Sequence, residues 1–188
     1  MAHKEQKEYF INVKNKFPSY FTNKKVLDIG SLDINGNNKH LFSDCEYLGL
    51  DIAEGKNVDV VSLAHEYLEP DESFDVIISN DCFEHDMFYS KTFQNIARLL
   101  RPNGLFLFTC KTTGSLEHGT LNSDGGFSSP LTINYPGWEN YYKNITESDV
   151  RESIDVDSIF ENYEFSTLAS TADIRFWGIK SNTKKNVI

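Results

Sequence analysis

The stretch from Val26 to Gly36 places the strongest constraint on the fold. It begins with an apolar run that contains Asp28 and continues through Gly30 and Ser31 into a polar loop. This pattern is typical of a buried parallel strand whose carboxyl end opens into a tight loop. Ligands of open α/β sheets bind at that edge, where a glycine lets the backbone approach closely and an acid accepts hydrogen bonds. We therefore expect the first strand to hold a small molecule.

Further apolar runs predict the remaining strands. They cover about residues 46–52, 58–61, 74–81 and 105–110, followed by two alternating runs at 163–170 and 173–180. A helix of period 3.6 is predicted over residues 86–101, between two of these strands. Strands that alternate with helices imply a parallel sheet with right-handed crossovers. The last two runs are separated by a short turn, which favours an antiparallel hairpin at one sheet edge.

Helices are also predicted near both ends of the chain. Apolar residues recur at helical spacing over residues 3–17, within an N-terminal segment of residues 1–22, and this helix should cover a sheet edge or the ligand site. Thr146-Glu147-Ser148-Asp149 matches a capping box and should open a helix that runs to about Phe160. Arg101-Pro102-Asn103-Gly104 should end the helix at 86–101. At 188 residues the chain fits one domain spanning 1–188.

Residues 111–145 interrupt the alternation of strands and helices. The segment is rich in Gly, Ser, Thr, Asn and aromatic residues, and it is too long for an ordinary connection. Long irregular segments of compact domains are often binding loops. We expect this one to form a lid over the acceptor side of the site.

Charge and cysteine content narrow the range of partners. The formal net charge is −10, which opposes binding to nucleic acid or to an anionic membrane surface. The three cysteines are widely spaced, so reduced thiols in a cytoplasmic protein are the simplest interpretation. No signal peptide and no membrane span are evident in the sequence. A small molecule is the expected partner, and the oligomeric state is not predicted.

Four motifs in register carry a resemblance to a known family. They are Asp28-Ile29-Gly30-Ser31, Asp51 at the end of the second strand, Phe74 to Asn80, and Leu99 to Phe106. Over residues 20–110 the chain thereby resembles the class I S-adenosylmethionine-dependent methyltransferases. The resemblance implies a doubly wound, Rossmann-like, mostly parallel seven-stranded sheet with a C-terminal antiparallel hairpin. It also implies S-adenosylmethionine as cofactor and S-adenosylhomocysteine as product.

The resemblance also assigns roles around the cofactor. Asp28, the Gly30 backbone and Ser31 would lie along the methionine portion, and Asp51 would accept hydrogen bonds from the ribose hydroxyls. The remaining assignments are Ile52 against the adenine face, Leu63 and His65 near the adenine edge, and Asn80 and Asp81 beneath the methionine, facing the acceptor. Leu32 and Ile34 stand where the family carries further glycines, so the loop should take a different path.

Methyl transfer needs a nucleophile aligned with the sulfonium, and a hydroxyl acceptor gains from a base. His85, in a Glu-His pair like that of many small-molecule members of the family, and His118, in the irregular segment, are the leading bases, with Asp81 beside them. Each position also has a structural interpretation. Asp28 could cap its loop, His85 could bond a neighbouring loop, and His118 could lie on the surface.

The same region also contains residues that suit a metal site and an aromatic platform. Glu84, His85, Asp86, His118 and Asp124 could hold a divalent ion, but a solvated acidic cluster is favoured, so no metal ligand is predicted. Trp138, Tyr141 and Tyr142 could stack on a sugar or fill a small core, whereas Phe88 and Phe93 are predicted to be core residues.

The preferred function is O-methylation of a sugar, sugar nucleotide or glycan precursor. His118-Gly119-Thr120 and Tyr141 to Thr146 look like a subgroup associated with surface-polysaccharide gene clusters. One alternative is a non-catalytic partner subunit that keeps the cofactor pocket. The other is a nucleotide-dependent oxidoreductase, which is disfavoured because the loop after the first strand lacks the Gly-x-Gly-x-x-Gly spacing. The identity of the acceptor is not predicted.

Overall fold

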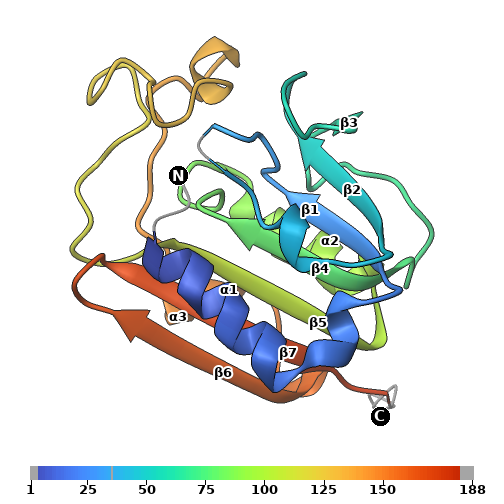
Figure 1. Ribbon diagram of the computed structural model, residues 1–188. Helices are drawn as coiled ribbons and strands as arrows, with labels where there is room; N and C mark the ends of the chain where they lie inside the picture. The colour runs from blue at the N-terminus through green and yellow to red at the C-terminus, as the bar shows by residue number, and fades with distance from the viewer. Residues whose placement is uncertain (1–3, 35, 183–188) are drawn as a thin grey trace.

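A seven-stranded sheet carries the candidate site at the carboxyl ends of its parallel strands. The computed structural model describes residues 4–34 and 36–182, and the strand order is β3-β2-β1-β4-β5-β7-β6 (Figure 1). The strands are β1 (Lys25–Ile29), β2 (Glu46–Asp51), β3 (Val60–Val61), β4 (Phe74–Asn80), β5 (Leu100–Lys111), β6 (Phe160–Leu168) and β7 (Asp173–Lys180). The predicted mostly parallel seven-stranded α/β sheet is confirmed.

Strand direction changes at β7. The five strands from β3 to β5 pair in parallel with their neighbours, whereas β7 is antiparallel to both β5 and β6. A short turn joins β6 to β7, so these two strands form the predicted hairpin, with β6 at the sheet edge (Figure 1). The hairpin begins earlier than predicted because β6 starts at Phe160, directly after a helix.

Helical segments cover both faces of the sheet. They are α1 (Lys4–Lys16), α2 (Tyr89–Leu99), α3 (Glu147–Ser153) and α4 (Val156–Ile159), with the 3-10 turns η1 (Pro18–Phe21), η2 (Lys39–Leu41) and η3 (Thr132–Asn134). On one face, α1 buries Phe10 and Val13 against Val26 of β1. On the other, α2 buries Phe93 and Ile96 in the larger core. Each such side chain stabilises the fold by about 1.5–3 kcal/mol through burial.

The position of α1 refines the prediction for the N-terminal helix. Figure 1 shows α1 lying across a face of the sheet and not along an edge, and its buried side chains belong to the core on that face. Its first turn nevertheless reaches the end of β4 through Gln6, which is fully buried. The expectation of a helix beside the ligand site therefore applies to the first turn alone.

The ends of β1, β2 and β4 meet at one edge because their registers are aligned. Ile29 lies opposite Leu50 on one side and Ser79 on the other. The Ser79 hydroxyl donates to the Ile29 carbonyl at 2.9 Å, which fixes the two strand ends together. Consequently, the residues that follow each strand lie next to one another, as expected for the ligand edge of a parallel sheet.

Two predicted helix ends differ from the structure. α2 ends at Leu99, and residues 101–104 form an irregular start of β5, since Phe74 pairs with Leu100 and Val76 with Leu105. The Thr146–Asp149 capping box is present, but its helix stops at Ser153 and does not reach Phe160. Asp155 accepts a hydrogen bond from the Ser158 amide at 3.1 Å and caps the separate helix α4. Because Asp155 is a second N-cap residue, the chain starts a new helix here and does not continue α3.

No helix within the described residues is both long enough and apolar enough to cross a membrane.

Candidate active site

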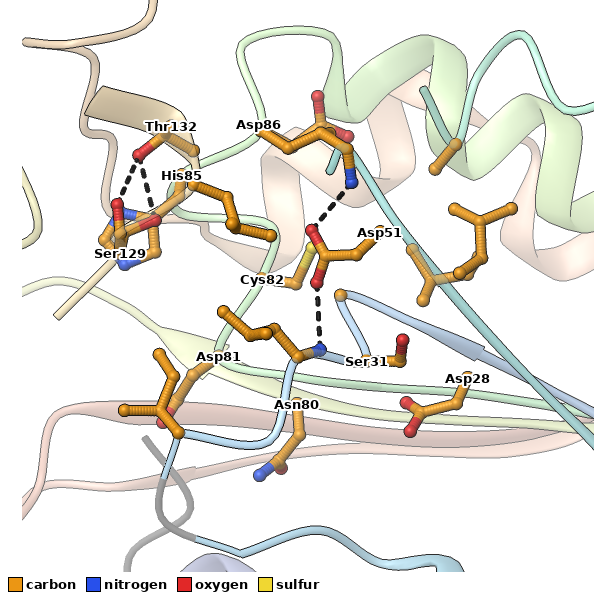
Figure 2. A pocket seen from close by; sticks show the side chains of 18 of the residues that line it. Asp28, Ser31, Asp51, Asn80, Asp81, Cys82, His85, Asp86, Ser129 and Thr132 are labelled. Atoms are coloured by element: carbon orange, nitrogen blue, oxygen red, sulfur yellow. Dashed lines mark hydrogen bonds between the residues drawn. The ribbon is translucent and has the colours of Figure 1, made fainter. Parts of the chain in front are cut away.

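A cleft lies at the carboxyl ends of β1, β2 and β4 and is closed on one side by the irregular segment (Figure 2). The strand ends contribute Asp28, Gly30, Ser31, Asp51, Ile52, Asn80 and Asp81 to its lining. Sequence analysis had named all seven for the cofactor or the reaction. Leu63 does not line the cleft, although its neighbours Ser62 and Ala64 do. His65 packs instead on Phe88, with ring centroids 4.4 Å apart.

Asp28 is buried inside the cleft wall. Its carboxylate accepts hydrogen bonds from the Tyr47 hydroxyl at 2.6 Å and the Asn57 amide at 3.5 Å. Burial is the main cause that raises the pKa of Asp28 to about 7, and the nearby Asp51 adds to the rise. The carboxyl is therefore poised to ionise when a cation binds beside it.

Gly30 is required by the close approach of two strand ends. Its φ is +74°, and a Cβ there would lie 2.5 Å from the Cβ of Cys82, which follows β4. The amides of Gly30 and Ser31 both donate to the Leu50 carbonyl, at 2.9 and 3.2 Å. A side chain at this position would push the loop away from β4 and into the space that the cleft provides.

Asp51 ties the loop after β1 to the end of β2. Its two carboxylate oxygens accept hydrogen bonds from the amides of Leu32, at 2.9 Å, and Ile52, at 2.8 Å (Figure 2). Burial raises the pKa of Asp51, while the two amide donors act in the opposite direction. The contact with Leu32 holds the loop after β1 at the cleft although this loop has few glycines. The residues of this loop that line the cleft are Leu32, Ile34, Gly36, Asn37 and Asn38. Asn35 lies outside the described residues.

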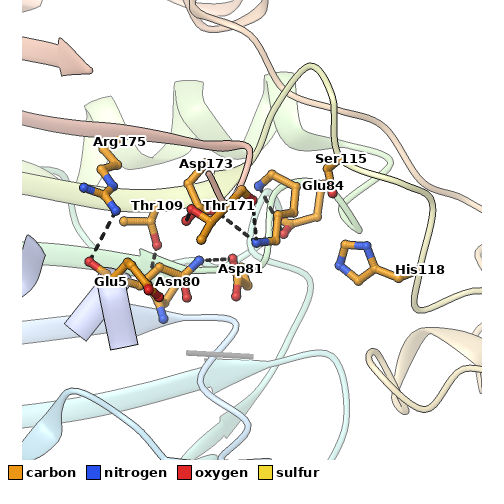
Figure 3. A network of polar contacts seen from close by, with 12 residues as sticks. Glu5, Asn80, Asp81, Glu84, Thr109, Ser115, His118, Thr171, Asp173 and Arg175 are labelled. Carbon is orange, nitrogen blue, oxygen red and sulfur yellow. Dashed lines mark hydrogen bonds and ion pairs between the residues drawn. The ribbon is translucent and has the colours of Figure 1, made fainter. Parts of the chain in front are cut away.

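Asn80 ends β4, Asp81 follows it, and both accept hydrogen bonds from residues of other elements. The Asn80 side-chain oxygen accepts from the Thr109 hydroxyl, and Asp81 accepts from the Gln6 side-chain amide. Arg175 of β7 donates to the Glu5 backbone oxygen at 3.3 Å, so the last strand supports the helix that bears Gln6 (Figure 3). Sequence analysis missed Gln6. The signal for it was a polar residue in the apolar stripe of the helix, three residues before Tyr9.

The two histidines named as bases lie together. The rings of His85 and His118 are nearly perpendicular, with centroids 5.0 Å apart, and Tyr142 packs against both. His85 lines the cleft, whereas His118 stands behind it and is not part of the lining. Burial is the main cause that lowers the pKa of His85 to about 3, so the ring is neutral at physiological pH.

Glu84 is fully buried beside this pair. Its Oε1 accepts a hydrogen bond from the Lys111 amide at 3.2 Å, whereas its Oε2 has no hydrogen-bond partner among the described residues. Burial is the main cause that raises the pKa of Glu84 to about 8, and the charge of Asp81 contributes. A protonated carboxyl at neutral pH is thus expected at this point of the unliganded site.

The other two acids of the supposed solvated cluster have local structural roles. Asp86 accepts hydrogen bonds from the Phe88 amide at 2.7 Å and the Thr92 hydroxyl at 2.5 Å, at the start of α2. Asp124 accepts from the Ser128 hydroxyl at 2.6 Å in the irregular segment. Among the described residues, the group whose ligand atoms lie within 4.8 Å of one another consists of Glu84, His85 and His118, and neither Asp86 nor Asp124 belongs to it.

The irregular segment provides the second wall of the cleft. Its lining residues are Ser128, Ser129, Pro130, Leu131, Thr132 and Trp138. The hydroxyls of Ser129 and Thr132 lie 2.9 Å apart (Figure 2), and the Trp138 ring packs on Phe88 and Tyr135. Phe88 therefore supports this wall and is only partly buried, while Phe93 is a core residue as predicted. Only Trp138 among these wall residues had been considered from the sequence.

Comparison with known proteins agrees with this geometry. A family model described as a methyltransferase domain matches residues 1–153. No curated protein matches the sequence.

Several solved structures share the fold. The 1,6-didemethyltoxoflavin-N1-methyltransferase of Burkholderia thailandensis, solved with 1,6-didemethyltoxoflavin and S-adenosylhomocysteine, is 16% identical with a TM-score of 0.56, covering 97% of this chain and 92% of that one. The phosphoethanolamine N-methyltransferase 2 of Haemonchus contortus, solved with phosphomonomethylethanolamine and S-adenosylhomocysteine, is 17% identical with a TM-score of 0.60, covering 93% and 52%. The cyclase SpnF is 14% identical with a TM-score of 0.59, covering 89% and 62%. These likenesses establish the fold, which a cyclase also uses.

Proposed function

The chain belongs to the class I methyltransferase family, and from this premise we propose that it transfers the methyl group of S-adenosylmethionine to a hydroxyl oxygen of a sugar or glycan precursor. The single observation that carries the proposal is the cleft itself. One part is lined by carboxylates at strand ends, and the other by hydroxyls, an indole ring and an imidazole. The first part suits an adenosyl cofactor and the second a polyhydroxylated acceptor.

The donor half follows from the ends of β1 and β2. Asp28 and the Gly30 backbone would lie along the methionine portion, whose ammonium group an ionised carboxylate attracts. Asp51 would accept hydrogen bonds from the ribose hydroxyls with the lone pairs that its two backbone donors leave free. Ile52 and Ala64 would pack on the adenine. Solved relatives of the same fold carry S-adenosylhomocysteine, in agreement with this donor.

The acceptor half follows from the irregular segment and the end of β4. Ser128, Ser129 and Thr132 offer hydroxyl groups, and Trp138 offers the apolar ring face on which sugars commonly stack. The net charge of −10 disfavours a nucleic-acid acceptor. A small polar molecule with several hydroxyls is the acceptor class that these groups match.

Chemically, the site has to align the acceptor oxygen with the methyl carbon and remove a proton. Asp81 and Asn80 lie between the two halves of the cleft, where they would position the sulfonium and the acceptor. His85 lines the acceptor side, and although burial lowers its pKa to about 3, its neutral ring would take the proton as the O–CH3 bond forms, because a methylated hydroxyl is far more acidic than the free alcohol. The His118 ring adjoins it. The leaving group is neutral S-adenosylhomocysteine, so the protein need not stabilise a departing anion.

Replacing Asp51 by alanine should weaken S-adenosylmethionine binding by about 1–3 kcal/mol, because the ribose hydroxyls lose a charged acceptor. The Asp51→Asn variant, which keeps one oxygen for the Leu32 or Ile52 amide, should lose less affinity. Isothermal titration measures both. Asp71→Ala, which removes an exposed carboxylate paired with Arg98, is the control and should leave the dissociation constant unchanged. An unchanged constant for Asp51→Ala would mean that the ribose lies elsewhere.

Binding of S-adenosylmethionine should also depend on pH through Asp28. Only the ionised carboxylate attracts the ammonium group, and burial raises the pKa of Asp28 to about 7 in the unliganded protein. Between pH 5.5 and 7 the dissociation constant should therefore fall by roughly tenfold. The free energy of unfolding of the unliganded protein should change in the opposite direction. The raised pKa of Asp28 stabilises the fold fully below about pH 4, and this stabilisation is lost as the pH rises through 7.

The Asp28→Asn variant provides the control for this pH dependence. Its amide oxygen can still accept the Tyr47 hydroxyl hydrogen bond, but the side chain does not titrate. Its affinity for S-adenosylmethionine should be lower and nearly constant over the same pH range. A wild-type constant that does not change with pH would place the ammonium group away from Asp28.

The proposed function is tested by incubating the protein with methyl-labelled S-adenosylmethionine and a panel of sugar nucleotides, followed by mass spectrometry of the products. We expect a product heavier by one methyl group. Folded protein that gives no binding heat at millimolar S-adenosylmethionine would refute the donor. Binding without transfer to any hydroxyl acceptor, alone or with a partner protein, would refute the acceptor and support the non-catalytic alternative.

A further inference from the structure

Three ligand-type side chains converge behind the acceptor side of the cleft. One ligand atom each from Glu84, His85 and His118 lies within 4.8 Å of the other two. Figure 3 shows the His118 ring beside the Glu84 carboxylate. Glu84 and His85 come from the turn after β4 and His118 from the irregular segment, so two parts of the chain meet here.

Two of these side chains have a buried polar atom that lacks a partner. Among the described residues, neither Oε2 of Glu84 nor Nδ1 of His85 has a hydrogen-bond partner. The Glu84 side chain is fully buried, and His85 is 6% exposed. An unpartnered buried polar atom lowers the stability of the fold by about 1–3 kcal/mol. Two such atoms side by side therefore indicate a place where a ligand binds.

In Glu84 and His118, another polar atom of the side chain contacts the backbone. Oε1 of Glu84 accepts from the Lys111 amide at 3.2 Å. Nδ1 of His118 lies 3.0 Å from the Leu116 carbonyl, a contact that places its proton on Nδ1 and leaves the Nε2 lone pair available. Metal-binding histidines usually donate their other ring N–H in this way, which orients the ring.

The backbone next to His118 also fits a close assembly. Gly119 has φ +70°, and a Cβ there would lie 2.6 Å from Cε1 and 3.1 Å from Nδ1 of His85. A glycine at this point lets the loop that bears His118 approach the His85 ring. The pair of histidines is therefore brought together by the fold of both segments.

We propose that Glu84, His85 and His118 form a binding site for a divalent transition-metal ion of the zinc type. Two imidazoles and one carboxylate suit Zn²⁺ and its neighbours in the first transition row, whereas Mg²⁺ and Ca²⁺ prefer oxygen ligands. Ligand atoms on one zinc ion are about 3–4 Å apart. The present limit is 4.8 Å, so a small rotation of the half-buried His118 ring would bring the three ligand atoms to that spacing. Three protein ligands leave a further coordination position open.

The site would affect the proposed methyl transfer, and this consequence rests on the proposed function. His85 lines the cleft, so an acceptor oxygen could occupy the open position. A hydroxyl bound to such an ion loses its proton more readily, so the ion would replace His85 as the activating group and the proton would pass to water, because a neutral imidazole that coordinates the ion has no second lone pair. Metal binding itself requires no acceptor and no cofactor.

The experiment uses the full-length protein, first dialysed against a chelator and then titrated with Co²⁺. We expect one equivalent of Co²⁺ to give a visible absorption band, which Zn²⁺ removes by displacement and Mg²⁺ does not. His118→Ala should weaken Co²⁺ binding by about 100-fold or more, since even loss of an outer partner costs roughly 10- to 100-fold. Glu84→Gln, which keeps an oxygen for the Lys111 amide, should do the same.

Asp124→Asn is the matched control, because it removes a nearby carboxylate charge that is not one of the three ligands, while its amide oxygen can still accept from the Ser128 hydroxyl. It should keep the affinity for Co²⁺, and circular dichroism should show all variants folded. Absence of the band in the wild-type protein, or an unchanged affinity in folded His118→Ala, would overturn the proposal. Because the readout is metal binding, failure of the methyl-transfer assay would leave this result unaffected.

Discussion

Replacing His85 by alanine should lower turnover on a hydroxyl acceptor by about 100-fold or more while leaving the affinity for S-adenosylmethionine nearly intact. His85 lines the acceptor side of the cleft, whereas the carboxylates assigned to the cofactor lie within β1 and at the end of β2. Removing the imidazole would therefore take away the proton acceptor and leave the donor half in place. Labelled methyl transfer measures the first effect and isothermal titration the second.

His85→Asn separates proton transfer from hydrogen bonding. An asparagine side chain stays polar but does not accept a proton at neutral pH, so it should be as slow as alanine. His118→Ala should reduce turnover too if the second imidazole assists the first. The assays should use chelator-treated protein as well, so that loss of a base is distinguished from loss of an ion. A fully active double variant would leave acceptor alignment as the remaining source of rate enhancement.

The largest loss of stability is expected from Asp173→Ala, which should lower the free energy of unfolding by about 3–5 kcal/mol. Asp173 is fully buried and lies 2.7 Å from Nζ of Lys111, which is also buried. The ammonium group donates further to the Thr171 carbonyl at 3.2 Å. Without Asp173, Lys111 would retain a buried charge that has lost its counter-ion. Urea unfolding measures the change.

Two further variants define the cause of this loss. Glu147→Ala breaks an exposed pair with Arg151 and should cost no more than about 1 kcal/mol. A Lys111→Met, Asp173→Leu double variant removes both charges and should recover most of the stability, because apolar residues of similar volume often replace buried pairs without loss. A cost for Asp173→Ala no greater than that for Glu147→Ala would show that the pair is not stabilising.

Most of the sheet could be predicted from the sequence because parallel strands buried on both faces are continuous apolar runs. The ends of those runs also indicated the edge at which the cleft lies, since each of β1, β2 and β4 runs out into polar residues. The capping box was readable for the same reason: Thr146 and Asp149 act on backbone within three residues. Interactions between residues this close in the sequence form independently of how distant segments pack.

Contacts between distant segments could not be predicted. The bond between Gln6 and Asp81 joins residues 75 positions apart, and nothing in either neighbourhood indicates the other. Leu63, which we predicted to lie near the adenine edge, is outside the lining of the cleft for a different reason. Ser62 and Ala64 line the cleft instead, and in an irregular segment the side of the chain that faces a ligand does not follow from periodicity. The wall formed by residues 128–132 lacks a periodic pattern as well.

The contact of Arg175 with the Glu5 backbone has a consequence for synthesis of the protein. It joins residues 170 positions apart, and through α1 it supports the Gln6 side chain that holds Asp81. Because β7 is synthesised after the other six strands, that support is missing until β7 has left the ribosome. A nascent chain without β7 thus lacks the support of Asp81, so ligands would stabilise the cleft after β7 has paired with β5 rather than guide early folding.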